Sequence, residues 1–223
     1  MVEKILRTKN TIILATSTSE KNQAIHTVGF DQKKVFVLEN AIDKNTIGED
    51  KNLEKTLKGK TYICTVGRPS FQKNLEMLIR VFETVAQNNR KVHLFIIGAG
   101  EYSPRKDKII QMINKRNLNN RATILPWVSR KQVQTYIKNA ELYVSSSRYE
   151  GMPYSVIESM ALSTPCILTN VDGNRDLVID KKSGFLVEVD DDVEMRSKIT
   201  KYFYEKPELV LDVGLKGALN SLE

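Results

Sequence analysis

From residue 60 onward, short apolar runs alternate with stretches in which apolar residues recur every three or four positions. The recurring pattern predicts amphipathic helices, most clearly where Leu75, Leu78, Phe82 and Val85 share one face. Two helical stretches, broken at Lys206-Pro207, are predicted to close the chain. The short runs predict buried strands, at Thr61–Val66, Val92–Ile97, Thr123–Leu125, Leu142–Ser145, Cys166–Thr169 and Gly184–Val187. Strands that alternate with helices, and that are apolar on both sides, predict an α/β fold with a doubly wound parallel sheet.

The first 50 residues depart from this pattern. Thr11–Ala15 and Val35–Leu38 are predicted strands with a short amphipathic segment between them. Two strands and one helix bury too little surface to form a stable domain alone. The polar stretch Asp43–Lys60 then has the composition of a linker. We therefore expect residues 1–50 to be the last piece of one domain, 51–59 to be a linker and 60–223 to be a complete second domain.

The net charge of +7 raises the question of nucleic-acid binding, but basic residues are spread along the chain. The one denser patch, from Arg105 to Arg116, alternates with Ile109 and Ile113 and is typical of a solvated helix face. None of the recognised nucleic-acid-binding modules is visible, so we expect no nucleic-acid partner. The charge suits anionic small ligands or an anionic membrane surface.

The remaining composition favours a cytoplasmic protein. Any contact with a membrane would be peripheral, at the inner face. The longest apolar runs fall far short of the roughly 18 residues of a spanning helix, and no secretion signal is visible. Cys64 and Cys166 sit singly in strand-like runs, which favours buried free thiols. His26 and His93 are also isolated, so no metal-ligand spacing is present.

Ligands in open α/β sheets bind where strands end and helices begin, and two such junctions carry notable side chains. The segment Gly67–Asn74 follows the first strand of the second domain. Ser70 is a candidate N-cap that would place Lys73 in the first helical turn, where a bound anion would offset its charge. Arg68 lies in the same loop. The alternative is that Arg68 and Lys73 are two solvated surface cations.

The second junction follows the strand Leu142–Ser145. Gly151 lets the backbone approach a ligand closely, and Pro153 suits the first turn of a helix. Glu158 lies in a helix that is apolar nearly all round, and such a carboxylate is rarely buried without a partner. A pair of sugar or ribose hydroxyls would satisfy it. The alternative is a capping or salt-bridge role, with Arg148 or Lys182 as the partner.

At this junction the chain resembles a known family. Glu150 and Glu158, with seven residues between them, are similar to the paired-glutamate motif of the retaining family-four glycosyltransferases. That family has the GT-B fold of two facing Rossmann-like domains. Further segments match in order and spacing: Gly67-Arg68 with Lys73-Asn74, Ile96–Glu101, Met160–Pro165, Thr169–Gly173, Lys182–Val187 and the interdomain segment Val37–Asp43. The resemblance implies the donor-binding half of such an enzyme, with Rossmann-like folding and the end of the acceptor-binding half attached.

The resemblance also implies roles for individual residues. Catalysis would rest on Arg68 and Lys73, which would grip the donor diphosphate, and on Glu150, which would contact the donor sugar. Glu158 would hold the ribose. The remaining donor-binding positions would be Gly67, Gly98, Gly151, Met152, Pro153 and Tyr154. The family transfers a hexosyl unit from a nucleotide-diphosphate sugar to a glycan or lipid-linked acceptor without a metal or other cofactor, and no protein nucleophile is required.

Some positions depart from the family pattern. Glu39 and Ala41 stand where the interdomain segment usually has Pro and Gly, and Ser163 stands where Gly is usual. The region that normally supplies the acceptor site is missing, and neither His26 nor His93 matches the family's donor-contacting histidine. We therefore expect this chain alone to be inactive. Two alternatives stay open: a non-catalytic nucleotide-sugar-binding subunit that needs a separate acceptor-binding partner, and a degenerate interaction module.

Overall fold

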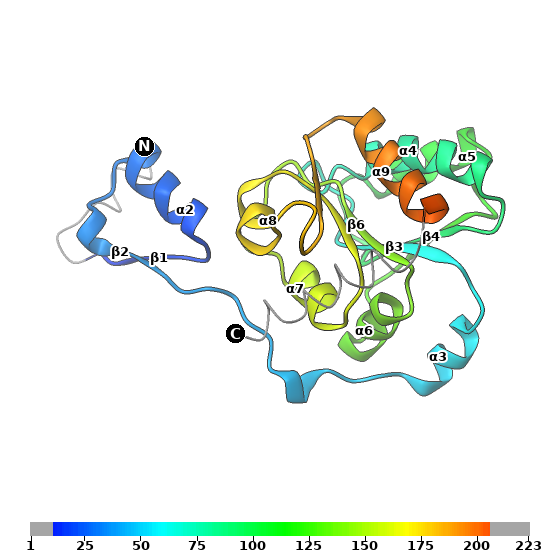
Figure 1. The fold of residues 1–223 in the computed structure, drawn as a ribbon, viewed down its shortest axis with the longest axis horizontal. Coiled ribbons are helices and arrows are strands. Elements are labelled where there is room, and N and C mark those ends of the chain that lie inside the picture. Colours follow the sequence, from blue (N-terminus) through cyan, green and yellow to red (C-terminus); the bar gives the residue numbers. More distant parts are fainter. Residues whose placement is uncertain (1–10, 206–223) are drawn as a thin grey trace.

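A computed structural model of the chain describes residues 11–205. Within this range, six strands form one parallel sheet in the order β5-β4-β3-β6-β7-β8 (Figure 1). The order reverses between β3 and β6, where Ile63 lies opposite both Leu94 and Leu142. The predicted doubly wound parallel sheet is confirmed. Its strands are β3 (Tyr62–Val66), β4 (His93–Ile97), β5 (Ala122–Leu125), β6 (Leu142–Ser145), β7 (Cys166–Thr169) and β8 (Phe185–Val187).

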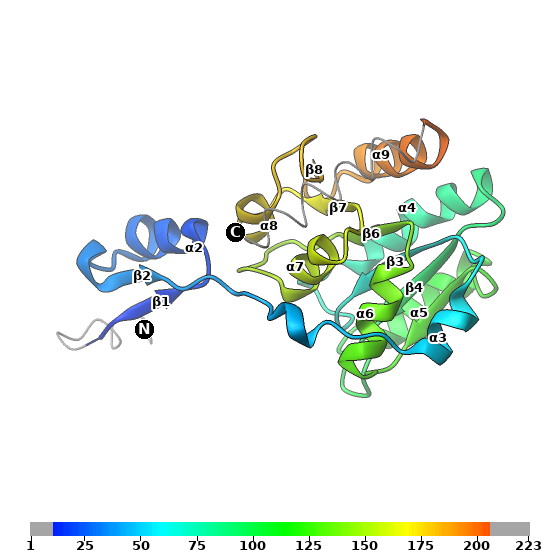
Figure 2. The same ribbon diagram turned by 60° about the horizontal axis from the view of Figure 1, so that its bottom comes forward.

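Helices cover both faces of this sheet (Figure 2). One apolar core lies between the sheet and α4 (Leu75–Asn88), α5 (Lys106–Lys115) and α9 (Asp192–Glu205). The other lies between the sheet and α3 (Lys51–Leu57), α6 (Arg130–Lys138) and α7 (Tyr154–Ala161). A further short helix, α8 (Asp172–Leu177), follows β7.

The strands are buried on both sides because successive side chains point to opposite faces. Ile63 belongs to the first core, while Tyr62 and Cys64 belong to the second. Cys64 and Cys166 are free and buried, as expected, and burial raises the pKa of the Cys166 thiol to about 12.

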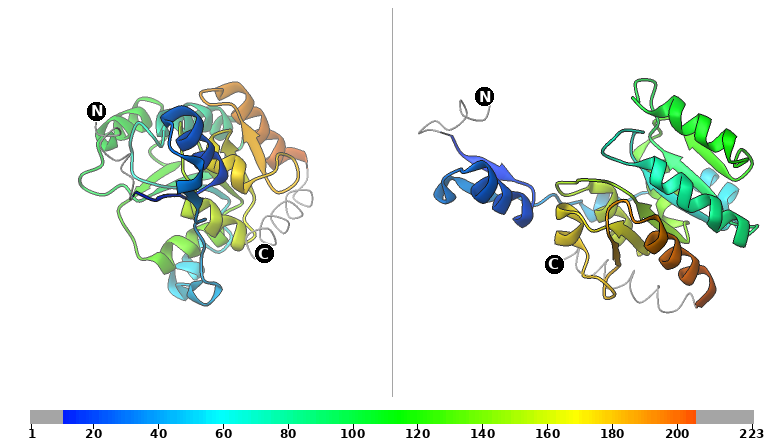
Figure 3. Two further views of the ribbon diagram at one scale, coloured as in Figure 1. Left: turned by 90° about the vertical axis from the view of Figure 1, so that its left-hand side faces the viewer. Right: turned by 90° about the horizontal axis from the view of Figure 1, so that it is seen from above.

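Residues 11–38 form a small N-terminal unit beside α8 (Figure 3). Its strands, β1 (Ile13–Ala15) and β2 (Val35–Val37), pair in parallel, and α2 (Thr18–Gln23) packs against both. A π-helix (Ala24–Val28) and a 3-10 turn (Gln32–Lys34) complete the connection between the strands. The strand face away from α2 carries four large apolar side chains that are 51–64% exposed, namely Ile12, Leu14, Phe36 and Leu38. This agrees with the expectation that so few elements cannot bury a core of their own.

The segment 51–59, which the sequence predicts to be a linker, is instead largely helical. After a 3-10 turn (Lys44–Thr46), Asp50 accepts hydrogen bonds from the backbone of Asn52 and Leu53 and starts helix α3. Leu57 is buried in the second core, and α3 packs against α6. The polar composition therefore reflects the exposed face of a helix. The buried side chain of Leu57 holds this helix against the domain.

The basic patch of α5 faces acidic residues of α4. Arg105 and Lys108 both pair with Glu76, and Arg116 pairs with Glu83. Ile109 and Ile113 are buried beneath, as the amphipathic pattern predicts. No helix in residues 11–205 is long and apolar enough to cross a membrane. The second of the two predicted closing helices lies beyond Pro207, outside the described residues.

Candidate functional site

Two loops lie side by side at the carboxyl edge of the sheet, where the strand order reverses. One follows β3 and the other follows β6. The Arg148 N–H donates to the Gln72 carbonyl at 2.8 Å, and the Gln72 side-chain amide donates to the Tyr149 carbonyl at 3.1 Å. Crevices at such a switch point are where open α/β sheets bind ligands. The two junctions singled out in the sequence therefore form one continuous surface.

Lys73 and Glu150 meet across these loops. The Lys73 ammonium lies 2.6 Å from Glu150 Oε1, and the Ser147 hydroxyl donates to the same oxygen at 2.6 Å. The Gln72 amide donates to Oε2 at 3.3 Å. The Glu150 side chain is only 7% exposed, so the cation compensates a charge that would otherwise be costly to bury. The arrangement holds a carboxylate and an ammonium in fixed positions at the mouth of the crevice.

The backbone approaches closely at Gly67 and Gly98. The Gly67 N–H donates to the Ile97 carbonyl at 2.8 Å, and Gly98 has a φ of 101° that favours glycine. A Cβ at Gly67 would lie 2.8 Å from Cε of Lys73. The lysine side chain therefore lies directly against the glycine backbone, which a larger residue would prevent.

The start of α4 differs from the expectation. The Ser70 hydroxyl accepts a hydrogen bond from the Lys73 N–H at 3.2 Å, as a cap would. However, the helix begins at Leu75 and its N-cap is Asn74, whose φ of 48° is left-handed. The placement of Lys73 in the first helical turn is therefore wrong. The left-handed backbone at Asn74 separates the turn that contains Lys73 from the helix that follows. Lys73 lies in the loop before the helix and turns toward Glu150.

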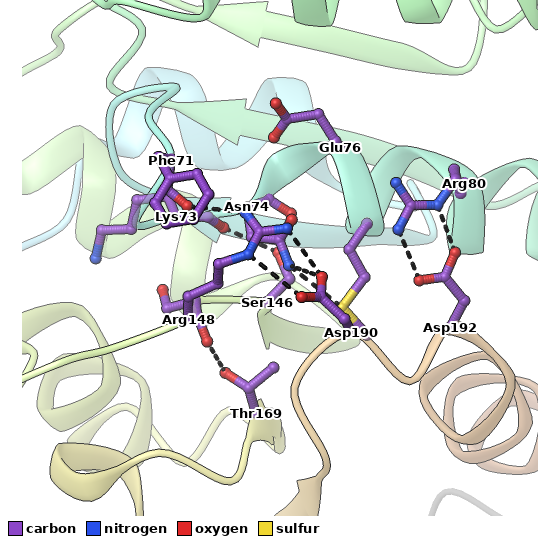
Figure 4. A network of polar contacts seen from close by, with 12 residues as sticks. Phe71, Lys73, Asn74, Glu76, Arg80, Ser146, Arg148, Thr169, Asp190 and Asp192 are labelled. Carbon is purple, nitrogen blue, oxygen red and sulfur yellow. Dashed lines mark hydrogen bonds and ion pairs between the residues drawn. The ribbon is translucent and has the colours of Figure 1, made fainter.

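A polar network centred on Asp190 and Arg148 holds the loop that contains Phe71 and Asn74 (Figure 4). Asp190 Oδ1 accepts from Asn74 Nδ2 and from Arg148 Nη2, each at 2.9 Å. Arg148 also donates to the Phe71 carbonyl at 3.0 Å and stacks 4.4 Å from the centre of the Phe71 ring. Desolvation alone would raise the pKa of Asp190, but the bonds from Asn74 and Arg148 outweigh it and lower that pKa. Arg148 thus pairs with Asp190 and not with Glu158.

Arg68 lies apart from this network and lines a cavity of about 470 Å³. Arg68 is exposed and makes no ion pair with any residue in the described range. Trp127 is 76% exposed, and a Cβ at Gly100 would lie 2.5 Å from its indole Nε1, so the ring covers that glycine. The cavity combines a free cation with an exposed aromatic ring, and its lining is Arg68, Gly100, Glu101, Tyr102, Ser103, Pro126 and Trp127.

The loop from Gly151 to Tyr154 leads into α7. Pro153 is the N-cap residue of that helix and Tyr154 is its first residue. The Met152 carbonyl accepts from Asn40 Nδ2 at 2.7 Å, which ties the loop to the N-terminal segment. Behind it, a Cβ at Gly173 would lie 1.8 Å from the Gly151 carbonyl oxygen. The loop is therefore held between α8 and the N-terminal unit.

Glu158 has protein partners, which agrees with the salt-bridge alternative but not with the partners that the sequence suggested. Arg130 Nε lies 3.0 Å from Glu158 Oε1, and Gln134 Nε2 donates to the same oxygen at 3.2 Å. Both partners come from α6, which packs on α7; neither Arg148 nor Lys182 is involved. Oε2 accepts no hydrogen bond from the described residues. One oxygen thus stays available to a ligand.

A comparison with known protein families identifies the chain's family. Residues 47–216 match the model of the family described as glycosyl transferases group 1. The chain belongs to this family. A relative from Campylobacter jejuni, N-acetylgalactosamine-N,N'-diacetylbacillosaminyl-diphospho-undecaprenol 4-alpha-N-acetylgalactosaminyltransferase, is 31% identical over 192 residues, covering 86% of this chain and 50% of the relative. The chain spans about half the length of the curated relatives it matches.

Solved structures show the same fold. Sucrose-phosphate synthase from Thermosynechococcus elongatus superposes with a TM-score of 0.87 at 20% identity, covering 99% of this chain and 55% of that one. Anabaena HepE in complex with UDP-glucose gives a TM-score of 0.86 at 17% identity, covering 98% of this chain and 60% of that one. The group 1 chain is thus an α/β Rossmann-like fold that matches GT-B glycosyltransferase structures.

Several residues of this site were not singled out from the sequence. Ser147 and Gln72 hold Glu150, and Trp127 lines the cavity beside Arg68. Gln72 directly precedes Lys73, and Ser147 lies three positions before Glu150, so a search for hydrogen-bond donors beside those two residues would have found them. Nothing in the sequence marks Trp127, because its importance depends on exposure rather than on residue type.

Proposed function

We propose that this chain is the donor-binding half of a glycosyltransferase that moves a hexosyl unit from a nucleotide-diphosphate sugar to a glycan or lipid-linked acceptor. Residues 1–50 would be the end of the acceptor domain. The observation that carries the proposal is the contact between Lys73 and Glu150 at the switch point of the sheet. A buried carboxylate beside an ammonium can bind sugar hydroxyls and a diphosphate at adjacent positions.

The donor would lie across both loops. Lys73 and Arg68 would neutralise the diphosphate, since no residue in the range 11–205 forms an ion pair with Arg68 and competes for it. The nucleotide base of the donor would stack on Trp127, because any nucleobase can stack its flat face on an aromatic ring. Glu158 Oε2 would accept from the ribose. Gly67, Gly98, Gly151, Met152, Pro153 and Tyr154 would line the path of the donor.

The chemistry would be that of a retaining transferase in which these cations stabilise the leaving diphosphate. No metal ion would be needed to neutralise the negative charge of the leaving diphosphate. These roles need no protein nucleophile, and the acceptor's proton would pass to the leaving phosphate. The protein would work in the cytoplasm, with an anionic membrane surface as a peripheral contact when the acceptor is lipid-linked.

A second candidate is a subunit that binds the nucleotide sugar and works only with a separate acceptor-binding partner. The exposed apolar face of Ile12, Leu14, Phe36 and Leu38 favours it, because parallel sheets are normally covered on both faces. Both candidates require the same donor site.

Calorimetric titration with uridine and guanosine diphosphates tests the shared donor site. At least one should bind, and Arg68→Ala should weaken it about tenfold or more, because a hydrogen bond to a charged group contributes about 1.5–3 kcal/mol. Arg90→Ala is the matched control, since Arg90 is exposed between α4 and β4, at the opposite edge of the sheet. If neither nucleotide binds, or if Arg68→Ala binds like the control, the donor site is wrongly placed.

A further inference from the structure

A cavity of about 500 Å³ lies at the amino ends of β3, β4 and β5. Its volume is within the range of small-molecule sites, about 300–1,000 Å³. The proposed donor site lies at the opposite, carboxyl ends of the same strands. The strand β4 has five residues, which at about 3.3 Å per residue separate the two ends by roughly 16 Å. A ligand in this cavity is therefore distinct from the donor diphosphate.

Side chains from three neighbouring strands line the cavity. His93 and Phe95 lie on the same face of β4 because they are two positions apart. Thr123 lies on β5 directly opposite Phe95, and its hydroxyl oxygen lies 2.8 Å from His93 Nε2. Thr61 precedes β3, and its carbonyl accepts from the His93 N–H at 3.0 Å. The lining therefore combines an imidazole with two hydroxyl groups.

Positive charges gather at this end of the sheet without acidic partners. Lys60 and Lys91 line the cavity, and neither forms an ion pair with a residue in the range 11–205. Arg121, just before β5, donates to the carbonyls of Asn89 and Val92 at 2.6 Å, and these neutral groups leave its charge uncompensated. No acidic residue of the described chain lines the cavity. The cations repel one another, and a bound anion would turn that repulsion into attraction.

These positive charges also act on His93. Burial lowers the pKa of its imidazole, and Arg121 and Lys60 lower it further. Two tyrosines pack on the same side of the sheet, Tyr62 from β3 and Tyr136 from α6, and burial raises the pKa of both. The tyrosines therefore stay neutral where a histidine titrates. His93 is thus the group of this cavity whose charge changes near neutral pH.

The hydrogen bond between His93 and Thr123 links protonation to anion binding. In a neutral imidazole, Nε2 can accept from the Thr123 hydroxyl. A protonated imidazole donates from both nitrogens, so Nε2–H then donates to Thr123 Oγ1, and the hydroxyl hydrogen is free to bind an anion. Protonation therefore adds a positive charge and a hydrogen-bond donor to the cavity at the same time.

We propose that this cavity binds a phosphate group, either as the free ion or on a small organic molecule, between Lys60 and Lys91. Thr61 and Thr123 supply hydroxyl donors to it. Two ammonium groups and two hydroxyls can each meet a different oxygen of a tetrahedral phosphate, whereas a carboxylate offers only two oxygens. A phosphate fills only part of the volume, and Phe95 lines the space that is left for an organic substituent.

The test uses the pKa of His93 as its readout. The chain has two histidines, so proton NMR can follow each imidazole separately in a titration from about pH 5 to pH 8. Sulfate is the first probe, because it resembles phosphate but stays a dianion throughout this range; chloride at equal ionic strength is the reference. Sulfate should raise the pKa of His93 by about one pH unit at saturation, the lower end of the effect of a neighbouring opposite charge. His26, which is exposed in the N-terminal unit, is the internal control.

The reverse side of this coupling is measured by calorimetry. A rise of one pH unit requires sulfate to bind the protonated protein about tenfold more tightly than the neutral form. Sulfate affinity should therefore increase as the pH falls, and His93→Gln should make it independent of pH.

Two lysine variants locate the anion. Lys60→Gln should weaken sulfate binding about fivefold, less than the loss of a buried charge-assisted bond because Lys60 is exposed. Lys58→Gln is the matched control, since it removes the same charge from an exposed side chain that does not line the cavity. Inorganic phosphate and glycerol 3-phosphate, compared at one pH, then distinguish the two sources. Tighter binding of glycerol 3-phosphate assigns the cavity to a phosphate ester, and equal or weaker binding assigns it to the free ion.

Four results would overturn the inference. The first is a His93 pKa that is the same in sulfate and in chloride. The second is an equal rise for His26, which would indicate screening alone. The third is a Lys60→Gln variant that binds sulfate like Lys58→Gln, and the fourth is the absence of any effect of both phosphate probes on the His93 signals. Because the readout lies at the other end of the sheet, each of these results leaves the proposed donor site untouched.

Discussion

Replacing Lys73 by Met tests whether the ion pair with Glu150 organises the site. The change removes the ammonium that lies 2.6 Å from Oε1 and leaves a carboxylate that is 7% exposed. Truncating one partner of a buried ion pair costs about 3–5 kcal/mol. The Lys73 side chain is 20% exposed, and Ser147 and Gln72 keep their bonds to Glu150. We therefore expect a smaller loss of unfolding free energy, about 2–3 kcal/mol.

For a chain of this size, that loss corresponds to a fall in Tm of about 4–12 °C. Thermal unfolding followed by circular dichroism measures it, with Lys91→Met as the control because Lys91 is exposed and forms no ion pair with any residue of the part of the chain that the structure describes. Glu150→Gln in the same background should restore part of the stability, since no buried charge then remains unpaired. A Tm equal to that of the control, with no coupling between the two changes, would refute the reasoning.

The remaining predictions concern the nucleotide and the reaction. Glu158→Gln should weaken nucleoside diphosphate binding and remove the discrimination against its 2′-deoxy or 3′-deoxy analogue, measured by calorimetry; an equal loss for all analogues would assign Glu158 a structural role with Arg130. The purified chain should form no glycoside at an enzymatic rate from labelled sugar nucleotides and a lipid or sugar acceptor pool. Transfer needs both reactants in a closed, water-poor cleft, and α2 with its two strands offers only a small second wall. Robust product formation would show that this unit, or a second copy of the chain, completes the cleft.

The sheet could be predicted from the sequence because each strand is a short apolar run buried on both faces. The run Thr61–Val66 became β3, and Leu142–Ser145 became β6, with almost unchanged bounds. Segment 51–59 could not be predicted in the same way, since its helix depends on one buried residue, Leu57, and on contacts with α6.

The candidate site was predictable in its residue types but not in its pairings. The sequence placed Lys73 and Glu150 at two strand ends, and the strand order brought them together. It did not reveal that Arg130 and Gln134 hold Glu158. These residues belong to another helix, α6, and lie 28 and 24 positions before Glu158 in the chain. Likewise, the left-handed turn at Asn74 depends on a carboxylate from a distant loop, which local pattern cannot show.

That turn has a consequence for how far the chain can be shortened. Asp190 lies just before α9. Its carboxylate accepts hydrogen bonds from both Asn74 and Arg148, which belong to the loops that follow β3 and β6. Asn74 Oδ1 is already buried with no hydrogen-bond partner among residues 11–205, so loss of the bond to Asp190 would make this turn unfavourable. Trimming the chain back beyond β8 would thus release the loop that carries Lys73, although no trimmed residue touches that lysine. The proposed donor site therefore requires a chain that extends at least through Asp190.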